Sequence, residues 1–319
     1  PFKNKIKITF LIKYLFNAII FSFKSFFKIF TEDFTNPLIL KEFPLLYFCK
    51  KAKTHQLAKK YFFHNSTSIF RPLWTYEAEK KKSKIIFFYY STNNTPLKFD
   101  KGYHRSYGNR EFMTWNNFYV WDKFQKEYVL NYFPKSKVEI VGPIWFESSG
   151  FEFNKAINNK KIVVIFDIQT LNENFYRKLG LPDRYITTSN MLKFHEDIIR
   201  VFDKVQNVKV ILKRKRSHTK FHDYRYLNFI KENYISEKYY EISPKTDATS
   251  IIKKCFLSIN YPPTSTALIS KDEKKNTIYY DPTKTVDPND KSICGIKLIK
   301  GYNDLELYID NLFSKNDNK

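Results

Sequence analysis

Residues 208–216 read VKVILKRKR, an apolar run of strand type that ends directly in four cations. A second run, FLSI at residues 256–259, leads into Asn260 and the turn YPPTST at residues 261–266, after which a helical pattern begins. In an open α/β sheet, ligands bind beyond the carboxyl ends of the strands, and a helix N-terminus offers unpaired N–H groups to a phosphate. The two runs therefore favour a phosphate-bearing ligand, such as an activated nucleotide.

Strand-type runs alternate with helical patterns on both sides of this stretch, which is the order of a parallel sheet. In the second half, strands are expected at residues 162–166, 208–212, 239–242, 256–259, 277–280 and 296–299. A helix capped by Ser189 and Asn190 should run to Phe202, and a last helix should cover 304–313. In the first half, strands are expected at 85–90, 118–121 and 138–141, and helical patterns at 50–63 and 122–132.

The length of 319 residues exceeds that of a typical single domain, so two domains are expected. Residues 151–160 are polar, lack a periodic pattern and separate the two series of strands and helices. We therefore expect an N-terminal α/β domain over 1–150 and a C-terminal α/β domain over 151–319.

The chain contains 55 Lys and Arg against 32 Asp and Glu, a formal charge of +23 that favours an anionic partner: nucleic acid, phospholipid or a phosphorylated substrate. Its three cysteines have no metal-type spacing, which indicates a reducing compartment without a zinc site. The seven glycines are isolated, so neither a dinucleotide fingerprint nor a P-loop is present in the sequence. His218 and His222 form a close pair but have no third ligand nearby, so no metal is expected.

The apolar segment at residues 6–30 is interrupted by Lys13, Lys24 and Lys28, and its uncharged runs are too short to cross a bilayer. These lysines and Asn17 fall on one helical stripe. Such a helix either lies in a membrane interface or packs its apolar face inward as an ordinary domain helix. The chain begins at Pro1 and shows no signal-peptide cleavage pattern, which favours a fragment of a longer protein.

Candidate anion-binding residues follow the two runs quoted first. In an extended segment, Lys213 and Lys215 would face one side and Arg214 and Arg216 the other, so one pair should meet a ligand unless the run is solvated. Thr264, Ser265 and Thr266 either hold phosphate oxygens or cap their own helix. Asp281 ends another strand and is expected to bind the donor by receiving a sugar or ribose hydroxyl.

Two residues are candidates for catalysis. Asp167 follows the strand at 162–166 and could serve as base or nucleophile, or cap the next segment. His104 lies in a polar loop with Asp100, Arg105 and Arg110, which either faces the ligand from the first domain or is a plain connection.

The sequence resembles bacterial surface-carbohydrate biosynthesis proteins over about residues 60 to 300. The resemblance rests on WD at 121–122 with Gln125 and Glu127, IVGPIWF at 140–146, KFHEDII at 193–199, the basic run 212–216, and segments 262–270 and 279–282. The proteins that it resembles are glycosyltransferases of the GT-B type, with two Rossmann-like domains facing a cleft, and they are similar to the Kdo transferases of capsule and lipopolysaccharide O-antigen assembly.

The resemblance implies a nucleotide-sugar donor, CMP-linked and Kdo-like, held by the second domain, with Lys213, Lys215, Arg216 and the turn at 264–266 on its phosphate and nucleotide. It also implies a cytoplasmic site at the inner face of the inner membrane and a glycan or glycolipid acceptor. The chain departs from the family at KRKR, where KPKR is expected, and at the charged residues 271–275. The first domain is short, which favours truncation on the acceptor side.

We therefore expect a glycosyltransferase that extends a surface glycan without a metal or other cofactor, because no Asp-x-Asp motif is present and cations can neutralise the leaving phosphate. One alternative is a basic, aromatic-rich protein that binds nucleic acid, but its cations are dispersed and it has no recognition motif, so nucleic acid is not expected. Another is an inactive, membrane-associated assembly partner.

Overall fold

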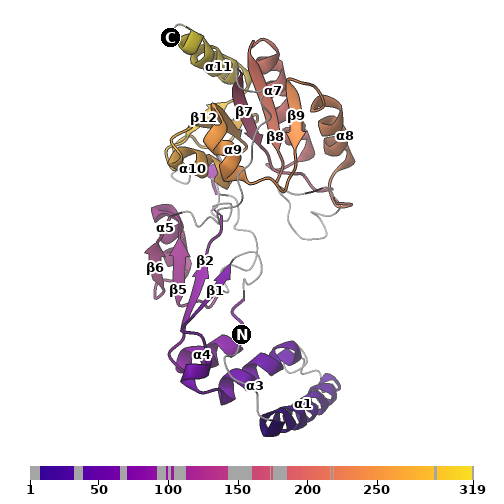
Figure 1. Ribbon diagram of the computed structural model, residues 1–319, viewed down its shortest axis with the longest axis vertical. Helices are drawn as coiled ribbons and strands as arrows, with labels where there is room; N and C mark the ends of the chain where they lie inside the picture. The colour runs from indigo at the N-terminus through magenta and orange to yellow at the C-terminus, as the bar shows by residue number, and fades with distance from the viewer. Residues whose placement is uncertain are drawn as a thin grey trace. The chain divides into compact units, whose positions relative to one another are not determined.

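The computed structural model describes residues 8–31, 39–64, 70–91, 98–99, 102–103, 113–142, 160–172, 174, 185–215, 217, 219–290 and 293–317. The chain divides into two compact units (Figure 1). Unit 1 comprises Pro1–Tyr90 and Gly108–Ile144, and unit 2 comprises Ser91–Tyr107 and Trp145–Lys319. The expected division between residues 150 and 151 stays a prediction, because residues 143–159 lie outside the described part.

Unit 1 contains a parallel sheet with the strand order β1-β2-β5-β6. Its strands are β1 (Lys60–His64), β2 (Lys84–Phe88), β5 (Asn117–Val120) and β6 (Lys137–Ile140). The central strands β2 and β5 supply the buried Ile85, Phe87 and Phe118. Parallel neighbours need crossover connections, and the chain passes through α4 (Trp74–Lys80) between β1 and β2 and through α5 (Lys123–Tyr132) between β5 and β6.

The helical pattern predicted over residues 50–63 is wrong. Helix α3 (Phe43–Lys51) ends where Ala52 takes an extended conformation, and residues 60–64 form β1 instead. This strand pairs with β2 along its whole length, from Lys60 opposite Lys84 to His64 opposite Phe88. Short apolar runs do not distinguish helix from strand, so the pairing with β2 decides the structure here.

Helix starts in both units are set by side-chain caps. Asp122 accepts hydrogen bonds from the backbone N–H groups of Phe124 at 2.8 Å and Gln125 at 2.9 Å, so α5 begins one residue after the predicted start. In unit 2 the cap of α7 (Thr188–Asp203) is Thr187, whose hydroxyl accepts from Asn190 N at 3.1 Å. The predicted cap at Ser189 and Asn190 is therefore wrong, because both residues lie in the first turn.

Unit 2 contains a parallel sheet with the order β12-β11-β10-β7-β8-β9. Its strands are β7 (Lys161–Phe166), β8 (Val208–Lys213), β9 (Tyr239–Ile242), β10 (Leu257–Asn260), β11 (Asn276–Asp281) and β12 (Lys297–Lys300). All six strands predicted for the second half are confirmed, and no end moves by more than one residue. A two-stranded antiparallel pair, β3 (Lys98–Phe99) and β4 (Gly102–Tyr103), belongs to the same unit.

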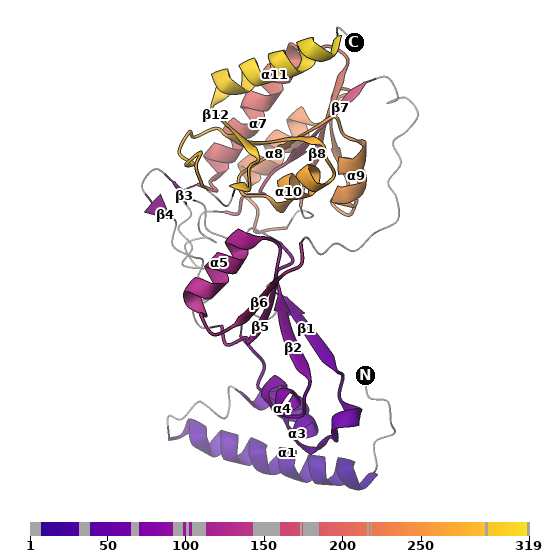
Figure 2. The same cartoon turned by 90° about the vertical axis from the view of Figure 1, so that its left-hand side faces the viewer.

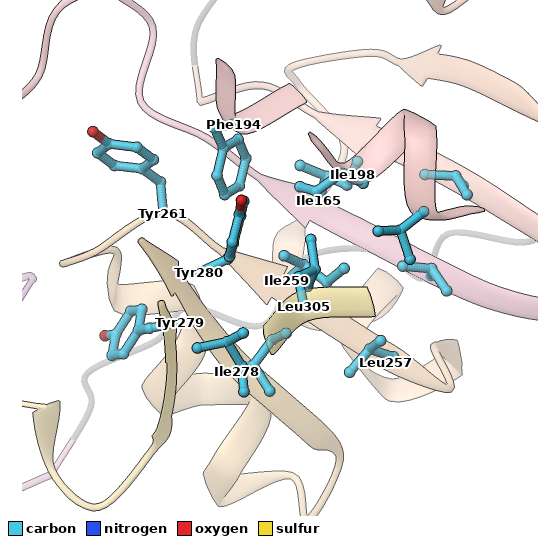
Figure 3. Packing of buried hydrophobic residues seen from close by; sticks show 14 of the residues in the cluster. Ile165, Phe194, Ile198, Leu257, Ile259, Tyr261, Ile278, Tyr279, Tyr280 and Leu305 are labelled. Atoms are coloured by element: carbon cyan, nitrogen blue, oxygen red, sulfur yellow. The ribbon is translucent and has the colours of Figure 1, made fainter. Parts of the chain in front are cut away.

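Helices cover both faces of the unit 2 sheet (Figure 2). They are α7, α8 (Tyr224–Asn233), α9 (Ala248–Lys254), α10 (Ser265–Asp272) and α11 (Tyr302–Asp317). Ile165 of β7 packs in the core with Phe194 and Ile198 of α7 and Leu305 of α11 (Figure 3). Val164 and Phe166, which alternate with it, pack on the other face with residues of α9 and α10. The sheet is thus buried on both faces, as parallel sheets are.

Candidate functional site

Three strands of unit 2 end side by side at what we call the carboxyl edge, at Phe166 of β7, Lys213 of β8 and Asn260 of β10, and Tyr279 of β11 lies next to Asn260. Leu212 pairs with Ile165, Phe166 pairs with Asn260, and Asn260 pairs with Tyr279. Since β7 alone separates β8 from β10, the ends of β8 and β10 are about 9.5 Å apart. The basic run and the hydroxyl-bearing turn therefore lie at the same edge, as the strand pattern predicts.

The two faces of the carboxyl edge hold different chemistry. Ile211 packs in the core of α9 and α10, and Lys213, two residues further along β8, lies on that same face. Asp167 lies two residues beyond Ile165 and contacts α7 and α8 on the opposite face. Lys213 and α10 therefore share one face of the sheet, and Asp167 does not.

The amide end of α10, formed by Thr264, Ser265 and Thr266, opens onto the carboxyl edge. Thr264 is the N-cap residue but its side chain makes no capping hydrogen bond, and its hydroxyl oxygen is buried without a partner. Its backbone is well held, because Tyr279 Oη donates to Thr264 O at 2.9 Å. A helix N-terminus has a partial positive charge, so this end has the donors and the polarity that an anion requires.

A buried polar network fixes α10 to the strands below it. Thr266 Oγ1 donates to Asn260 Oδ1 at 2.7 Å, and Asn260 Nδ2 donates to Ser258 Oγ at 3.1 Å and to Ile278 O at 3.3 Å. Ser258 Oγ lies 2.8 Å from Ser270 Oγ, in the second turn of the helix. Because buried polar groups are costly when unpaired, this network specifies one position for the helix and aims its N–H groups at the edge.

The basic run divides into buried and exposed cations. Lys213 Nζ donates to the carbonyl oxygens of Arg214 at 3.0 Å and Pro244 at 2.9 Å, and burial lowers the pKa of its ammonium, although Asp247 and Asp167 oppose that shift. The buried Arg214 forms an ion pair with Glu241 of β9. Lys215 is exposed. Strand β8 ends at Lys213 and Arg216 lies outside the described residues, so the predicted alternation of the four cations stays a prediction beyond Lys213.

Asp167 is the centre of a buried cluster that the sequence did not reveal. Its side chain is 0% exposed and accepts hydrogen bonds from His195 Nε2 at 3.1 Å and from the Tyr226 hydroxyl. His195 Nδ1 lies 2.8 Å from Tyr234 Oη, so the arrangement that pairs every proton has the imidazole donating through Nε2 and accepting at Nδ1. Burial, and then the charge of Asp167, raises the pKa of Tyr226 well above its usual range. The second oxygen, Asp167 Oδ1, is buried without a partner.

Asp281 is engaged by its own loop. Its Oδ1 accepts from Thr283 N at 2.9 Å, from Thr283 Oγ1 at 2.6 Å and from Tyr185 Oη at 3.2 Å, and its Oδ2 accepts from Val286 N at 2.8 Å. The carboxylate is completely buried. It therefore shapes the turn after β11, and the predicted contact with a sugar hydroxyl stays a prediction.

Some predicted residues lie outside the described part of the chain, namely His104, Arg216, Asp100, Arg105 and Arg110. Within the described residues, no three His, Cys, Asp or Glu side chains gather closely enough to hold a metal ion. Two surface depressions, of about 460 Å³ beside β5 and β6 and about 620 Å³ beside β12 and α11, contain none of the predicted site residues.

Comparison with known proteins places these features in a family and a fold. The family model of the polysaccharide biosynthesis PFTS motif proteins matches residues 21–309. None of the curated proteins matches the sequence. Among solved structures, the chain is similar to MnaA of S. aureus in its structure with UDP, with a TM-score of 0.51 and 9% identity over 85% of this chain and 70% of that one.

It is also similar to the UDP-GlcNAc 2-epimerase of Neisseria meningitidis bound to UDP-GlcNAc, with a TM-score of 0.52 and 10% identity over 88% of this chain and 75% of that one. At such identities the similarity defines the fold alone. Together with the two parallel sheets, it shows two Rossmann-like domains of the GT-B type.

Proposed function

The chain belongs to the polysaccharide biosynthesis PFTS motif proteins, and we propose that it is a glycosyltransferase that uses a nucleotide-activated sugar to extend a surface glycan. The donor phosphate binds at the carboxyl edge of unit 2, against the amide end of α10. The GT-B fold and the family support this class of enzyme. The observation on which the proposal rests is the unpartnered Thr264 hydroxyl at a helix N-terminus that a polar network holds in place.

A phosphate oxygen would complete the hydrogen bonding of this end. Thr264 has no capping bond, so its hydroxyl can donate to an anion. The N–H groups in the first turn of any helix lack the carbonyl four residues earlier that later N–H groups use, so this end presents backbone donors as well. Hydrogen bonds to a charged acceptor contribute about 1.5 to 3 kcal/mol each, which exceeds the contribution of neutral ones. A dry, pre-positioned set of donors therefore favours a phosphate over a neutral group.

The same donors assist the transfer itself. When the bond from the sugar to the phosphate breaks, its electron pair stays on the phosphate oxygen, and negative charge grows there. N–H groups that already point at that oxygen stabilise the charge without reorganisation. Lys213 lies on the same face of the sheet, and Lys215 follows it as an exposed cation. Neither a metal nor another cofactor is part of this proposal.

Two kinds of nucleotide-sugar donor are supported, each by a different argument. The resemblance to Kdo transferases supports a CMP-linked, Kdo-like sugar, whereas the similar S. aureus and N. meningitidis proteins are seen with UDP and UDP-GlcNAc. The features of the carboxyl edge described above recognise the phosphate, which both donors share. A comparison of CMP with UDP therefore separates the two donors.

Asp167 has a positioning role in this proposal. Its buried carboxylate joins the end of β7 to α7 and α8, through His195 and Tyr226, and so fixes the carboxyl edge. The role of His104 as a catalytic group stays a prediction. So does the placement of the reaction on the cytoplasmic face of the inner membrane.

The test is a thermal-shift screen of the full chain against CMP, UDP, GDP and ADP. A nucleotide at a hundred times its Kd stabilises the folded state by about 2.7 kcal/mol, which raises Tm by several degrees. We expect CMP or UDP to give this shift and the purine nucleotides to give less. The matching sugar nucleotide should then be hydrolysed or transferred, as measured by release of the free nucleotide. A chain that none of the four nucleotides stabilises contradicts the proposal, and a chain that binds one but never turns its donor over is an assembly partner instead.

A further inference from the structure

Helix α1 (Ile8–Ile29) exposes a broad apolar surface. The described residues include 23 exposed large hydrophobic side chains, and twelve of them lie on α1 or the residue after it. Their exposed fractions run from 38% at Ile20 to 72% at Phe30. The other eleven are scattered over several elements, as is normal for a soluble surface. The concentration on one helix therefore needs an explanation.

Helix α1 is exposed even though one of its faces already packs on α3 of the same unit. Phe10 and Tyr14 pack on Tyr47 of α3 with ring centroids 5.9 and 5.8 Å apart, and Phe21 stacks on Phe43 at 4.7 Å. Ser25 on the same stripe is buried. Figure 2 shows α1 next to α3 in unit 1. One face of α1 is thus docked on unit 1, and the apolar side chains occupy the remaining surface.

Lysines border this apolar surface. Lys13, Asn17 and Lys24 fall between the docked stripe and the apolar face, at about 100° per residue. The first 31 residues of the sequence contain six lysines and no acidic residue. An apolar face with a cationic border complements the boundary between acyl chains and anionic headgroups of a bilayer.

From these features we infer that α1 lies in the surface of an anionic membrane, with its apolar face among the acyl chains, its lysines at the phosphates and α3 behind it. The helix is long and apolar enough to cross a bilayer by length and composition, at about 33 Å for 22 residues. A crossing, however, would place Lys13 and Lys24 within the hydrocarbon and would remove Phe10, Tyr14 and Phe21 from α3. When α1 lies in the membrane surface instead, Lys13 and Lys24 stay at the phosphates, and Phe10, Tyr14 and Phe21 stay packed on α3.

A second copy of the chain fits this surface less well. Two α1 helices packed through their apolar faces would bring two lysine borders together, with no acidic side chain on either helix to offset them. Phospholipid phosphates supply the missing negative charge. The inference does not depend on the nucleotide site, because α1 belongs to unit 1 and the proposed site belongs to unit 2.

The experiment is co-sedimentation of the full chain with vesicles of phosphatidylcholine and phosphatidylglycerol, and with vesicles of phosphatidylcholine alone. The wild type should bind the anionic vesicles. Phe16→Ser with Phe23→Ser should weaken binding roughly tenfold or more, because two exposed rings no longer enter the acyl region. The matched control is Ile235→Ser with Leu307→Ser, which removes two exposed apolar side chains from other elements and should bind as the wild type does. Lys13→Gln with Lys24→Gln should weaken the preference for anionic lipid, because two of the six cations in this segment are removed.

Three results would overturn the inference. In the first, the Phe16 and Phe23 variant binds vesicles as tightly as the control. In the second, the wild type ignores vesicles but forms a dimer that this variant disrupts, which assigns the surface to a second copy. In the third, alkaline carbonate fails to extract the wild type from membranes, which assigns α1 to a span. A normal thermal shift with nucleotide in the Phe16 and Phe23 variant would show that the chain is folded and that unit 2 is unaffected.

Discussion

At the scale of single residues, Thr264 and Thr266 stand two positions apart but use their hydroxyl groups differently. The Thr264 hydroxyl is buried without a partner, whereas Thr266 donates to Asn260 Oδ1 at 2.7 Å. Thr264→Val should leave the unfolding free energy unchanged or raise it by up to about 1 kcal/mol, since it removes an unsatisfied buried group. The same change should weaken nucleotide binding roughly tenfold, by about 1.4 kcal/mol, because the phosphate loses a donor. Urea unfolding and calorimetric titration measure the two effects.

Thr266→Val is the matched control. Here the lost hydroxyl leaves Asn260 Oδ1 without its donor inside the protein, so the free energy of unfolding should fall by about 1 to 3 kcal/mol. If Thr264→Val instead lowers stability and keeps full affinity, the assignment of Thr264 to the phosphate is wrong.

Asp167 offers a second test at this scale. Asparagine has the same shape, and its carbonyl oxygen can accept from His195 and Tyr226 where Oδ2 now does, but the negative charge is lost and the amide N–H groups lie at the Oδ1 position, which is buried without a partner. Asp167→Asn should therefore destabilise the fold by about 2 kcal/mol while the folded protein keeps its nucleotide affinity. A variant with wild-type Tm and no transfer activity would show instead that Asp167 is the catalytic base that the sequence suggested.

At the scale of elements, the strands of unit 2 could be predicted because each is a short apolar run bounded by polar residues. Strand β1 could not, because its sequence KYFFH suits either structure until β2 pairs with it. The chemistry at the edge was partly predictable: strand order brings the ends of β8 and β10 together, but it does not show that Lys213 and Arg214 are engaged internally.

The polar network below α10 was not predictable, because Ser258, Asn260, Ser270 and Thr277 look like ordinary polar residues of separate segments. The signal that could have indicated it is two polar residues, Ser258 and Asn260, in a strand-type run that is otherwise apolar; in the structure all four residues of this strand are buried. The contact of His195 with Asp167 was not predictable either, although a histidine on the buried stripe of an amphipathic helix is a comparable signal.

The start of α8 gives a prediction for pH dependence. Asp223 caps this helix by accepting from Arg225 N at 2.9 Å, and the hydrogen bond from the Arg225 side chain is the first cause of a lowered pKa at Asp223. A lowered carboxyl pKa contributes stability above the unfolded value of about 4, and that stability is lost as pH falls through the folded value.

Asp223→Asn should therefore lower the unfolding free energy at neutral pH by about 1 kcal/mol and make Tm less dependent on pH below about 4. Arg225→Gln should reproduce most of the change, because it removes the charged donor and keeps the backbone cap. Melting curves between neutral and acid pH measure both variants. If Tm falls equally with pH below about 4 in the wild type and in Asp223→Asn, the explanation is refuted.

At the scale of the whole molecule, the formal charge of +23 favours several anionic partners without choosing among them. The structure offers a separate place for each of two such partners. A lysine-bordered apolar helix in unit 1 suits an anionic membrane, and a helix N-terminus with an unpartnered hydroxyl in unit 2 suits a nucleotide phosphate. Variants at the two places should consequently act independently, so that Thr264→Val leaves vesicle binding unchanged and the Phe16 and Phe23 variant leaves nucleotide binding unchanged.

The central claim is that a nucleotide phosphate binds the amide end of α10. Hydrogen exchange of the full chain, read by mass spectrometry with and without the nucleotide that gives the largest thermal shift, tests it most directly. We predict slower exchange in peptides that cover residues 264–270 and no change in α3 of unit 1. Bound nucleotide that slows exchange elsewhere but leaves residues 264–270 unaffected would contradict the account.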